Sequence, residues 1–503
     1  MKTCLIESTK ISRRSFLQAL GALTLSGSLA ACGSTGKAKS DRLAAGSLTY
    51  TPDEVVTVEF SDGGITVSPE DATGLAVEGT ALSVSGAGVY ALSGNCADGS
   101  VKVEAQTEDV VLLLDGLTLT SADTAPIVCG ESTGVTIAVV DGTENTLTDS
   151  EANDPDNAAD NENAEKAVVK CKDGSQVVLC GGGALTVNAL GKNGIKSGTA
   201  LDDRDASLTI RELTLNIEAL VNDAINAEQR LKVESGNLTI AAGEDAIHCD
   251  MELNIGAEGT TGPAITVSTC CEGLEGAVLN IHSGNMDITS TDDCLNAANS
   301  DLGDYAFEIN ISGGTIKAYS SEGDGFDSNG TLTITGGDIS VWTANAADNQ
   351  PLDADGRITI SGGTVLAAGG SAGMGFSISA SQPYVIFGGG RDSSLSLAGG
   401  EAFSIADESG KSVLDSTALC DAAFLFYSSP ALTAEGRYSV QSTVTATAKT
   451  GEADTQFGGN GGPGGSGGQR PDGMMPSDGQ MPQGQPPQSD GTTPPELPAA
   501  SSN

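Results

Sequence analysis

The sequence predicts an all-β protein whose strands stack in successive coils as a parallel β-helix. Three observations predict this fold. Apolar and polar residues alternate in short runs such as "VVTVEF" and "LTITGG" between residues 55 and 448, which is typical of β-strands. Glycine is abundant, at 67 of 503 residues, whereas the chain has only 10 Phe, 7 Tyr and 1 Trp, as expected of a stack of small repeats. Finally, similar units recur about every 20–30 residues, which is the sequence signature of a solenoid.

Each repeat ends in an apolar residue that we call the hub. A Gly-Gly or Ser-Gly step and a short strand come first, followed by an acid or amide, a small residue and then the hub. The strands are not spaced as hairpins joined by two-residue turns of the Asn-Gly type, which favours parallel over antiparallel pairing. We expect the hubs to stack inward and the longer repeats to form loops on one side. The hubs are Ile195, Ile225, Ile247, Leu274, Leu295, Phe326 and Leu352.

The N-terminal residues are typical of an export signal. Arg13 and Arg14 precede the apolar run "ALGALTLSGSLAA", which is too short to span a membrane. The run ends in Leu-Ala-Ala-Cys, which resembles a bacterial lipobox. We therefore expect residues 1–31 to be a twin-arginine lipoprotein signal peptide. Lipid attached to Cys32 would then hold the protein on the outer face of the cell membrane.

Three further segments follow from composition. Residues 32–54 are predicted to be a tether, and residues 55–448 the parallel β-helix domain. From residue 449 the chain becomes rich in Gly, Pro and Gln, so residues 449–503 are predicted to be a disordered tail.

The charge of the chain restricts its partners. It contains 67 acidic and 24 basic residues, for a net charge of −43. This excludes nucleic acid as an expected partner, because phosphate contacts need a basic surface. A strongly acidic surface instead favours divalent cations. We expect a monomer.

Acids and amides gather on both sides of the hubs. Because a hub that points inward forces its neighbours outward, the residues two places before and one place after it should form two columns on one edge of the stack. The first, which we call the pre-hub column, contains Asn193, Asp223, Asp245, Glu272, Asp293, Asp324 and Gln350. The second, the post-hub column, contains Lys196, Asn226, His248, Glu275, Asn296, Asp327 and Asp353.

The spacing of these columns indicates calcium. Equivalent residues on neighbouring coils lie about 4.8 Å apart, and Ca²⁺ takes oxygen ligands at about 2.3–2.6 Å. Two carboxylates on adjacent coils can therefore share one ion. The alternative is that these residues only serve the turns between strands. The predicted metal ligands are Asp245, Glu272, Glu275, Asp292, Asp293, Asn296, Glu322, Asp324, Asp327 and Asp353.

Several segments resemble a bacterial carbohydrate-binding family. They are "VVLLLDGLTLTS", "GTENTLTD", "GGGALTVNALGKNGIKSG" and the repeated Gly-Gly coils, and the resemblance extends from about Val55 to Thr447. It implies a right-handed parallel β-helix that binds polygalacturonate, with calcium sites like those of family-nine pectate lyases. The calcium motif of those lyases is two adjacent Asp residues and a third Asp three places on. Asp292 and Asp293 match the first two positions, and Asn296 stands at the third.

Calcium-dependent binding of an acidic polysaccharide of the pectin type is the function that this resemblance implies. A uronate lyase is the first alternative, because such enzymes use calcium together with a basic side chain. Lys317 is a weak candidate for that base, and the sequence favours binding over catalysis. A structural or adhesive solenoid is the second alternative. Tyr319, Trp342 and Tyr384 are candidate platforms for sugar stacking.

Overall fold

The structure is a computed structural model that describes residues 43–299, 302, 305–344, 349–370, 377–389 and 395–454. The predicted signal peptide, Cys32 and most of the predicted tail lie outside these residues. The described part is all-β, apart from two single-turn 3₁₀ helices, η1 (Pro52–Glu54) and η2 (Glu151–Asn153). None of its helices is long and apolar enough to cross a membrane.

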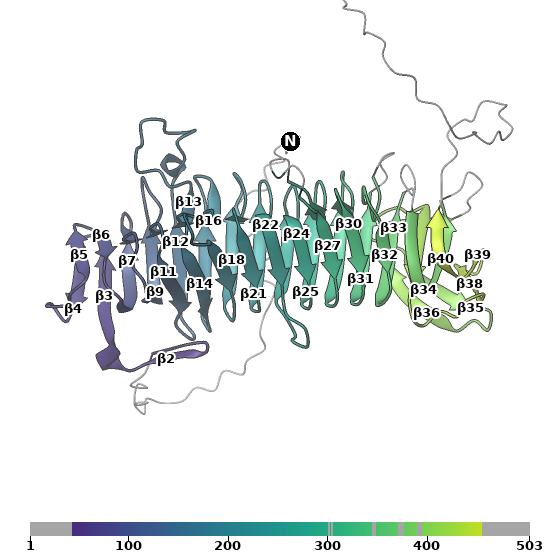
Figure 1. Cartoon of the computed structure of the whole chain (residues 1–503), viewed down its shortest axis with the longest axis horizontal. Coiled ribbons are helices and arrows are strands. Elements are labelled where there is room, and N and C mark those ends of the chain that lie inside the picture. The colour runs from purple at the N-terminus through teal and green to yellow at the C-terminus, as the bar shows by residue number, and fades with distance from the viewer. Residues whose placement is uncertain are drawn as a thin grey trace, which may run out of the picture. The chain divides into compact units, whose positions relative to one another are not determined.

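Three parallel ladders form most of the molecule (Figure 1). The first contains the hubs and runs through β6 (Ala81–Val84), β8 (Ser100–Val103), β10 (Ile127–Cys129), β13 (Ala167–Cys171), β16 (Asn193–Ser197), β19 (Ile225–Ala227), β22 (Ile247–Ile255), β24 (Leu274–Ile281), β26 (Leu295–Ala297) and β29 (Phe326–Ser328). The second runs through β3 (Val55–Ser61), β7 (Gly88–Cys96), β9 (Val110–Thr120), β11 (Gly134–Val139), β14 (Gln176–Gly181), β17 (Ser207–Ile210), β20 (Arg230–Val233), the second halves of β22 and β24, β27 (Glu308–Ile311), β30 (Thr331–Ile334), β32 (Ile358–Ile360) and β34 (Ser377–Gly388). The third runs from the end of β9 through β12 (Glu144–Thr148), β15 (Ala184–Asn188), β18 (Thr214–Ala219), β21 (Asn237–Ala242), β23 (Ala264–Thr269), β25 (Asn285–Ser290), β28 (Thr315–Ser320), β31 (Asp338–Thr343) and β33 (Thr364–Gly369).

The chain visits the three ladders in turn, so each turn of chain, or coil, places one strand in each ladder. Strands β14, β15 and β16 form one coil, for example, and pair in parallel with β17, β18 and β19 of the next. Alternate residues of each strand point inward, and together they form one continuous apolar core. The described residues contain no disulfide, and eight of their nine cysteines are buried in that core or beside it.

The predicted stacking of the hubs is confirmed by the strand register. Each hub pairs with the hub of the next coil, from Ile195 to Leu352. All seven side chains are fully buried, at 0% exposure. The alternation of apolar residues therefore predicted both the inward face of the first ladder and the coil-to-coil alignment that positions its neighbours.

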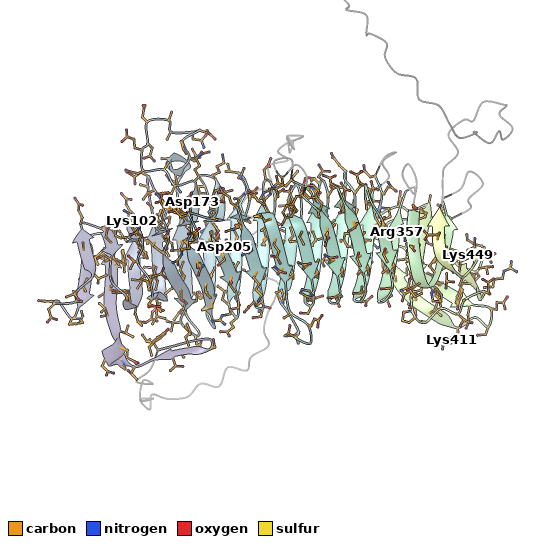
Figure 2. The ribbon with its side chains drawn as sticks, in the orientation of Figure 1. Lys102, Asp173, Asp205, Arg357, Lys411 and Lys449 are labelled. Carbon is orange, nitrogen blue, oxygen red and sulfur yellow. The ribbon has the colours of Figure 1, made fainter. Side chains whose placement is uncertain are left out.

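The two ends of the described chain differ from the prediction. The hairpin of β1 (Leu43–Ala45) and β2 (Leu48–Tyr50) lies within the range 32–54 assigned to a tether, and it covers apolar residues on the outer face of the second ladder. Strand β40 (Lys449–Asp454) lies within the range 449–503 assigned to a tail, and it pairs antiparallel with β34. Lys449, its first residue, is labelled in Figure 2.

The C-terminal part of the predicted β-helix range is an antiparallel cap. Four strands, β35 (Ala402–Asp407), β36 (Ser412–Thr417), β38 (Arg437–Val440) and β39 (Val444–Thr447), form a separate antiparallel sheet. Strand β37 (Phe424–Ser428) pairs antiparallel with both β33 and β34.

Two further hairpins lie near the other end, where β4 (Gly64–Ser68) pairs with β3 and β5 (Leu75–Glu78) pairs with β6.

The cap buries two of the three predicted stacking platforms. Trp342 is 0% exposed within a second apolar core that includes Phe403 and other residues of the cap. Tyr384 is 2% exposed, and its hydroxyl donates to the carbonyl of Glu452 across 3.0 Å. Neither ring can stack on a sugar in this arrangement. That prediction was wrong for both rings, because sequence alternation reveals neither the second sheet that covers Trp342 on the outer face of β31 nor the packing of Tyr384 against Phe426 of β37.

Candidate metal centre

The post-hub column is in register along the first ladder. Asn226 pairs with His248, His248 with Glu275, Glu275 with Asn296, and Asn296 with Asp327. Because each hub is fixed inward, the residue after it faces outward at the same edge on every coil. The prediction that acids and amides of different coils share one edge is therefore confirmed for these residues.

The pre-hub column is linked from coil to coil by hydrogen bonds. The backbone N–H of one coil donates to a carboxylate oxygen of the coil before it, so one oxygen of each such Asp accepts a hydrogen bond from the backbone. The pairs are Asp245 N–H to Asp223 Oδ1 at 3.2 Å, Glu272 N–H to Asp245 Oδ1 at 3.3 Å, Asp324 N–H to Asp293 Oδ1 at 2.6 Å, and Gln350 N–H to Asp324 Oδ1.

Three acids from two successive coils meet at the C-terminal end of the columns. Asp324, Asp327 and Asp353 each offer an oxygen, and these atoms lie within 4.8 Å of one another. None of the three is fully exposed, and Asp293 of the preceding coil lies against Asp324 through the hydrogen bond at 2.6 Å. We call Asp293, Asp324, Asp327 and Asp353 the upper cluster. All four belong to the predicted ligand set.

Burial and mutual repulsion raise the pKa values of the upper cluster. Burial first, and then the charge of Asp327, raise the pKa of Asp293 to about 9. The pKa of Asp324 rises to about 7 and that of Asp327 to about 6, in both cases through burial and then neighbouring carboxylates. Burial likewise raises the pKa of Asp353. Among the described residues, no basic side chain forms an ion pair with these acids, and a divalent cation would relieve both causes.

Gly323 makes room for the carboxylates of Asp292 and Asp293. A Cβ atom at this position would lie 2.3 Å from Asp292 Oδ1 and 2.6 Å from Asp293 Oδ1. No side chain fits at such distances. The glycine therefore lets the adjacent pair Asp292 and Asp293 approach the next coil.

Asn296 contributes an oxygen that lacks a partner. Its Oδ1 and Arg211 Nε are the buried side-chain polar atoms that have no hydrogen-bond partner within the described part of the chain. Asn296 is 8% exposed, and its Nδ2 donates to Glu272 Oε2 across 2.8 Å. A buried carbonyl oxygen without a donor is costly. Asn296 lies in register between Glu275 and Asp327. A hard cation such as Ca²⁺ takes carbonyl oxygens of this kind as ligands.

Farther toward the N-terminus, His248 lies among three carboxylates. Its Nδ1 contacts Asp245 Oδ2 at 3.2 Å and also Glu275 Oε2, while its Nε2 lies 2.8 Å from Asp250 Oδ1. Burial alone would lower the pKa of His248, but these hydrogen bonds raise it well above its usual value. The imidazolium therefore already occupies the space between Asp245 and Glu275 as a positive charge.

We call His248 and its partners Asp245, Asp250 and Glu275 the histidine level, and one further acid, Glu272, lies beside it. Burial, and then the charge of Asp245, raise the pKa of Glu272 to about 7. Burial also raises the pKa of Asp245 to about 7. Asp223, Glu244 and Asp245 form a further group with oxygens within 4.8 Å, although Asn226 Nδ2 already donates to Asp223 Oδ2 across 2.7 Å.

Comparison with known proteins supports the predicted family. Residues 78–373 match the model of the family of carbohydrate-binding domain-containing proteins. This range is more than half of the 503 residues and includes every cluster described above. The chain belongs to this family.

The chain is similar to a curated protein and to a solved structure. A carbohydrate-binding domain-containing protein of Acetivibrio thermocellus is 32% identical over 146 residues, which is 29% of this chain and 50% of the relative. The chain thus spans about half the length of the curated relative that it matches. The solved structure of the polysaccharide lyase-like protein from C. thermocellum, a gadolinium derivative, is 22% identical and covers 60% of this chain and 94% of its own, with a TM-score of 0.31.

Two predicted residues of the carbohydrate-binding domain do not join the clusters. Glu322 is exposed, and among the described residues it belongs to none of the three groups that could hold a metal ion, which are Asp324, Asp327 and Asp353, then Asp223, Glu244 and Asp245, and then Asp245, His248 and Glu275. Lys317 lies on β28, where its Nζ is 3.0 and 3.2 Å from the two carboxylate oxygens of Asp287. Both partners of this ion pair are about half exposed, at 49% and 51%.

The sequence analysis missed the basic end of the post-hub column. Strand register extends the column from Lys196 back to Lys170, then to Val128 and Lys102. Aligning hubs upstream of Ile195 would have found these lysines, because Val169 and Val101 hold the hub position in β13 and β8. One edge of the carbohydrate-binding domain therefore changes from basic to acidic along the stack.

Proposed function

We propose that the upper cluster binds calcium and, through it, an acidic polysaccharide of the polygalacturonate type. The observation that supports this most strongly is the set of oxygens from neighbouring coils that lack a positive partner. They come from Asp293, Asp324, Asp327 and Asp353, together with the unpartnered Oδ1 of Asn296. Ca²⁺ takes six to eight oxygen ligands in flexible geometry, so carboxylates and an amide oxygen suit it well.

The upper cluster is a better calcium site than the histidine level. His248 already contacts Asp245, Glu275 and Asp250, so a second cation there would meet an imidazolium. At the upper cluster, by contrast, no basic side chain of the described residues forms an ion pair with any of the four acids. We therefore assign the first calcium ion to the upper cluster.

Calcium also explains how so acidic a protein could hold an acidic polymer. A chain with a net charge of −43 repels a polyuronate. An ion held partly by the protein and partly by sugar carboxylates would join the two polyanions. Membership of the carbohydrate-binding family supports a polysaccharide ligand, and the charge argument supports an acidic one.

Two broader features belong to the same proposal. We infer that the three parallel ladders wind as a right-handed parallel β-helix. We also infer that the export signal and Cys32 anchor the domain by lipid on the outer face of the cell membrane, where polysaccharides are accessible. Neither inference is needed for the calcium site itself.

The test is binding to polygalacturonate with and without calcium. Protein lacking the predicted signal peptide should sediment with calcium-treated polygalacturonate and remain in solution in EDTA. Asp327→Asn should weaken the calcium-dependent binding, whereas Asp415→Asn, which removes an exposed acid from the cap, should not. Equal binding in EDTA and calcium, or an Asp327→Asn variant that behaves as wild type, would contradict the proposal. Ultraviolet absorbance of the same mixture reports any unsaturated lyase product.

A further inference from the structure

Two lysines lie one coil apart at the basic end of the post-hub column. Lys170 of β13 pairs in register with Lys196 of β16, and Lys102 of β8 (Figure 2) lies two coils farther along the same column. Such an arrangement is unexpected in a chain with 67 acidic and only 24 basic residues. Adjacent ammonium groups repel one another, and most lysines could find a carboxylate in such surroundings.

Lys170 has no carboxylate in contact with it. Within the described residues its Nζ makes no ion pair and no hydrogen bond. Neighbouring lysines differ in this respect, because Lys172 lies 2.7 Å from Glu165 and Lys192 lies 3.2 Å from Asp156. Burial, and then the charge of Lys196, lower the pKa of Lys170, and more distant carboxylates offset this only in part. The side chain is half-buried and aligned in the column, yet no acid of the described chain pairs with it.

Lys196 retains a donor that could serve the same ligand. Its Nζ donates to Asn226 Oδ1 across 2.8 Å and lies 2.8 Å from Glu228 Oε1. An ammonium group has three donors, so one remains after these two contacts. Equivalent residues on neighbouring coils lie about 4.8 Å apart. One carboxylate, with two oxygens, can therefore accept from both ammonium groups at once.

We propose that Lys170 and Lys196 form a subsite that binds a sugar carboxylate directly, without calcium. This inference rests on the proposed binding of an acidic polysaccharide and specifies how the polymer lies. Its carboxylates would contact lysines at one end of the post-hub column and a calcium ion at the other. A single anionic group relieves the repulsion between the two lysines and supplies the missing partner of Lys170.

The separation of the two ends sets a minimum ligand length. Five coil steps lie between Lys196 and Asp327 in the register, which corresponds to about 24 Å at the usual strand spacing. A disaccharide cannot contact both ends, whereas a longer oligomer can. Affinity should therefore increase sharply with the length of the oligogalacturonate until both ends are occupied, and then level off.

The test compares Lys170→Met with Lys170→Arg in the protein without its predicted signal peptide. In calcium, we expect Lys170→Met to weaken binding of a long oligogalacturonate about tenfold, and Lys170→Arg to restore most of it. The melting temperature of Lys170→Met should be unchanged or higher, because a repulsion is removed. Lys232→Met is the matched control, since Lys232 lies on β20 in the second ladder and pairs with Glu234 at 3.0 Å.

An oligogalacturonate of the same length, with free carboxylates at one end for the calcium ion and methyl esters along the rest, separates carboxylate recognition by the lysines from general effects. Lys170→Met should weaken binding of the free acid but not that of the ester. If the wild-type protein binds the oligomer and Lys170→Met binds it with the same affinity, the lysine subsite is overturned and the calcium proposal remains intact. An equal loss for acid and ester would also overturn it. Failure of the wild-type protein to bind any polygalacturonate would instead contradict the proposed function, and the subsite with it.

Discussion

The backbone N–H of Asp324 donates to Oδ1 of Asp293 across 2.6 Å, so the amide of one coil holds the carboxylate of the coil before it. This bond fixes where Asp293 points and leaves its second oxygen at the edge of the stack. Burial nevertheless raises the pKa of Asp293 to about 9. One amide donor therefore does not offset the loss of water around the carboxylate. The ionised form of Asp293 is less favourable in the folded protein than in water.

Stability in a chelator should fall as the pH rises from about 5 to about 8. The pKa values of Asp245, Glu272 and Asp324 rise to about 7 in the folded protein. The folded state thus binds more protons than the unfolded state above about pH 4, so deprotonation costs folding stability. Thermal melting in EDTA across this range measures the slope, and saturating calcium should remove the part that comes from Asp324, because Asp245 and Glu272 lie at the histidine level. A melting temperature that rises with pH, or an equal slope in calcium, would contradict this account.

Gly323→Ala should disrupt the upper cluster. The new Cβ would lie 2.3 Å from Asp292 Oδ1 and 2.6 Å from Asp293 Oδ1, so both carboxylates must move. We expect calcium affinity to fall about tenfold or more, which corresponds to about 1.4 kcal/mol, as measured by calorimetric titration. Gly63→Ala is the control, because its nearest heavy atom would be Ser61 Oγ at 3.7 Å. Unchanged calcium affinity in Gly323→Ala would show that the ion binds elsewhere.

Replacement of His248 should convert the histidine level into a second calcium site. His248→Gln leaves Asp245, Glu275 and Asp250 without their shared cation, and breaking such a buried contact costs about 3 kcal/mol. The variant should melt lower in EDTA, recover in calcium and bind one more ion per chain than wild type.

His282→Gln is the matched control for that experiment. The sequence has only these two histidines, and His282 Nδ1 contacts Ser312 Oγ at 2.9 Å, away from the acid clusters. It should alter neither the ion count nor the response to calcium. The assignment of His248 as the resident cation fails if His248→Gln gains no ion, as counted by metal analysis of equilibrated protein.

Truncation of the hub Phe326 should destabilise the stack. The ring is 0% exposed and pairs with Leu295 and Leu352 on the adjacent coils. We expect Phe326→Ala to cost about 3–5 kcal/mol in the free energy of unfolding, measured by denaturant titration. Phe326→Leu should cost much less, because the neighbouring hubs are leucines. Similar losses for both substitutions would indicate that the phenyl ring itself, rather than apolar filling, is required.

The sequence could predict the positions of those residues that a local pattern of apolar and polar residues identifies. The hubs from Ile195 to Leu352 align in the structure as their spacing predicted. The outward neighbours follow from them, so hub spacing alone was enough to bring Asp324 and Asp327 together. Glu322 belongs to the same acidic stretch but is exposed outside the clusters. A position within an acidic stretch does not determine which way the side chain points.

The remaining features depend on contacts between distant segments. Strand β37 is buried along its whole length, and nothing in its composition distinguishes antiparallel from parallel pairing. The burial of Trp342 results from packing with Phe403, 61 residues later in the numbering of the chain. Likewise, the contacts of His248 and the absence of an ion pair at Lys170 among the described residues depend on how side chains are placed in space. The periodicity of the sequence does not predict such contacts.

The antiparallel cap also has a consequence for the behaviour of the protein in solution. Strand β37 hydrogen-bonds to β33 and β34, and β40 to β34, so the last parallel strands do not present a free edge there. A stack of in-register strands with an open edge is a template on which a second molecule can continue the ladder and grow into a fibre. By turning the chain back on itself, the cap protects the domain against end-to-end polymerisation.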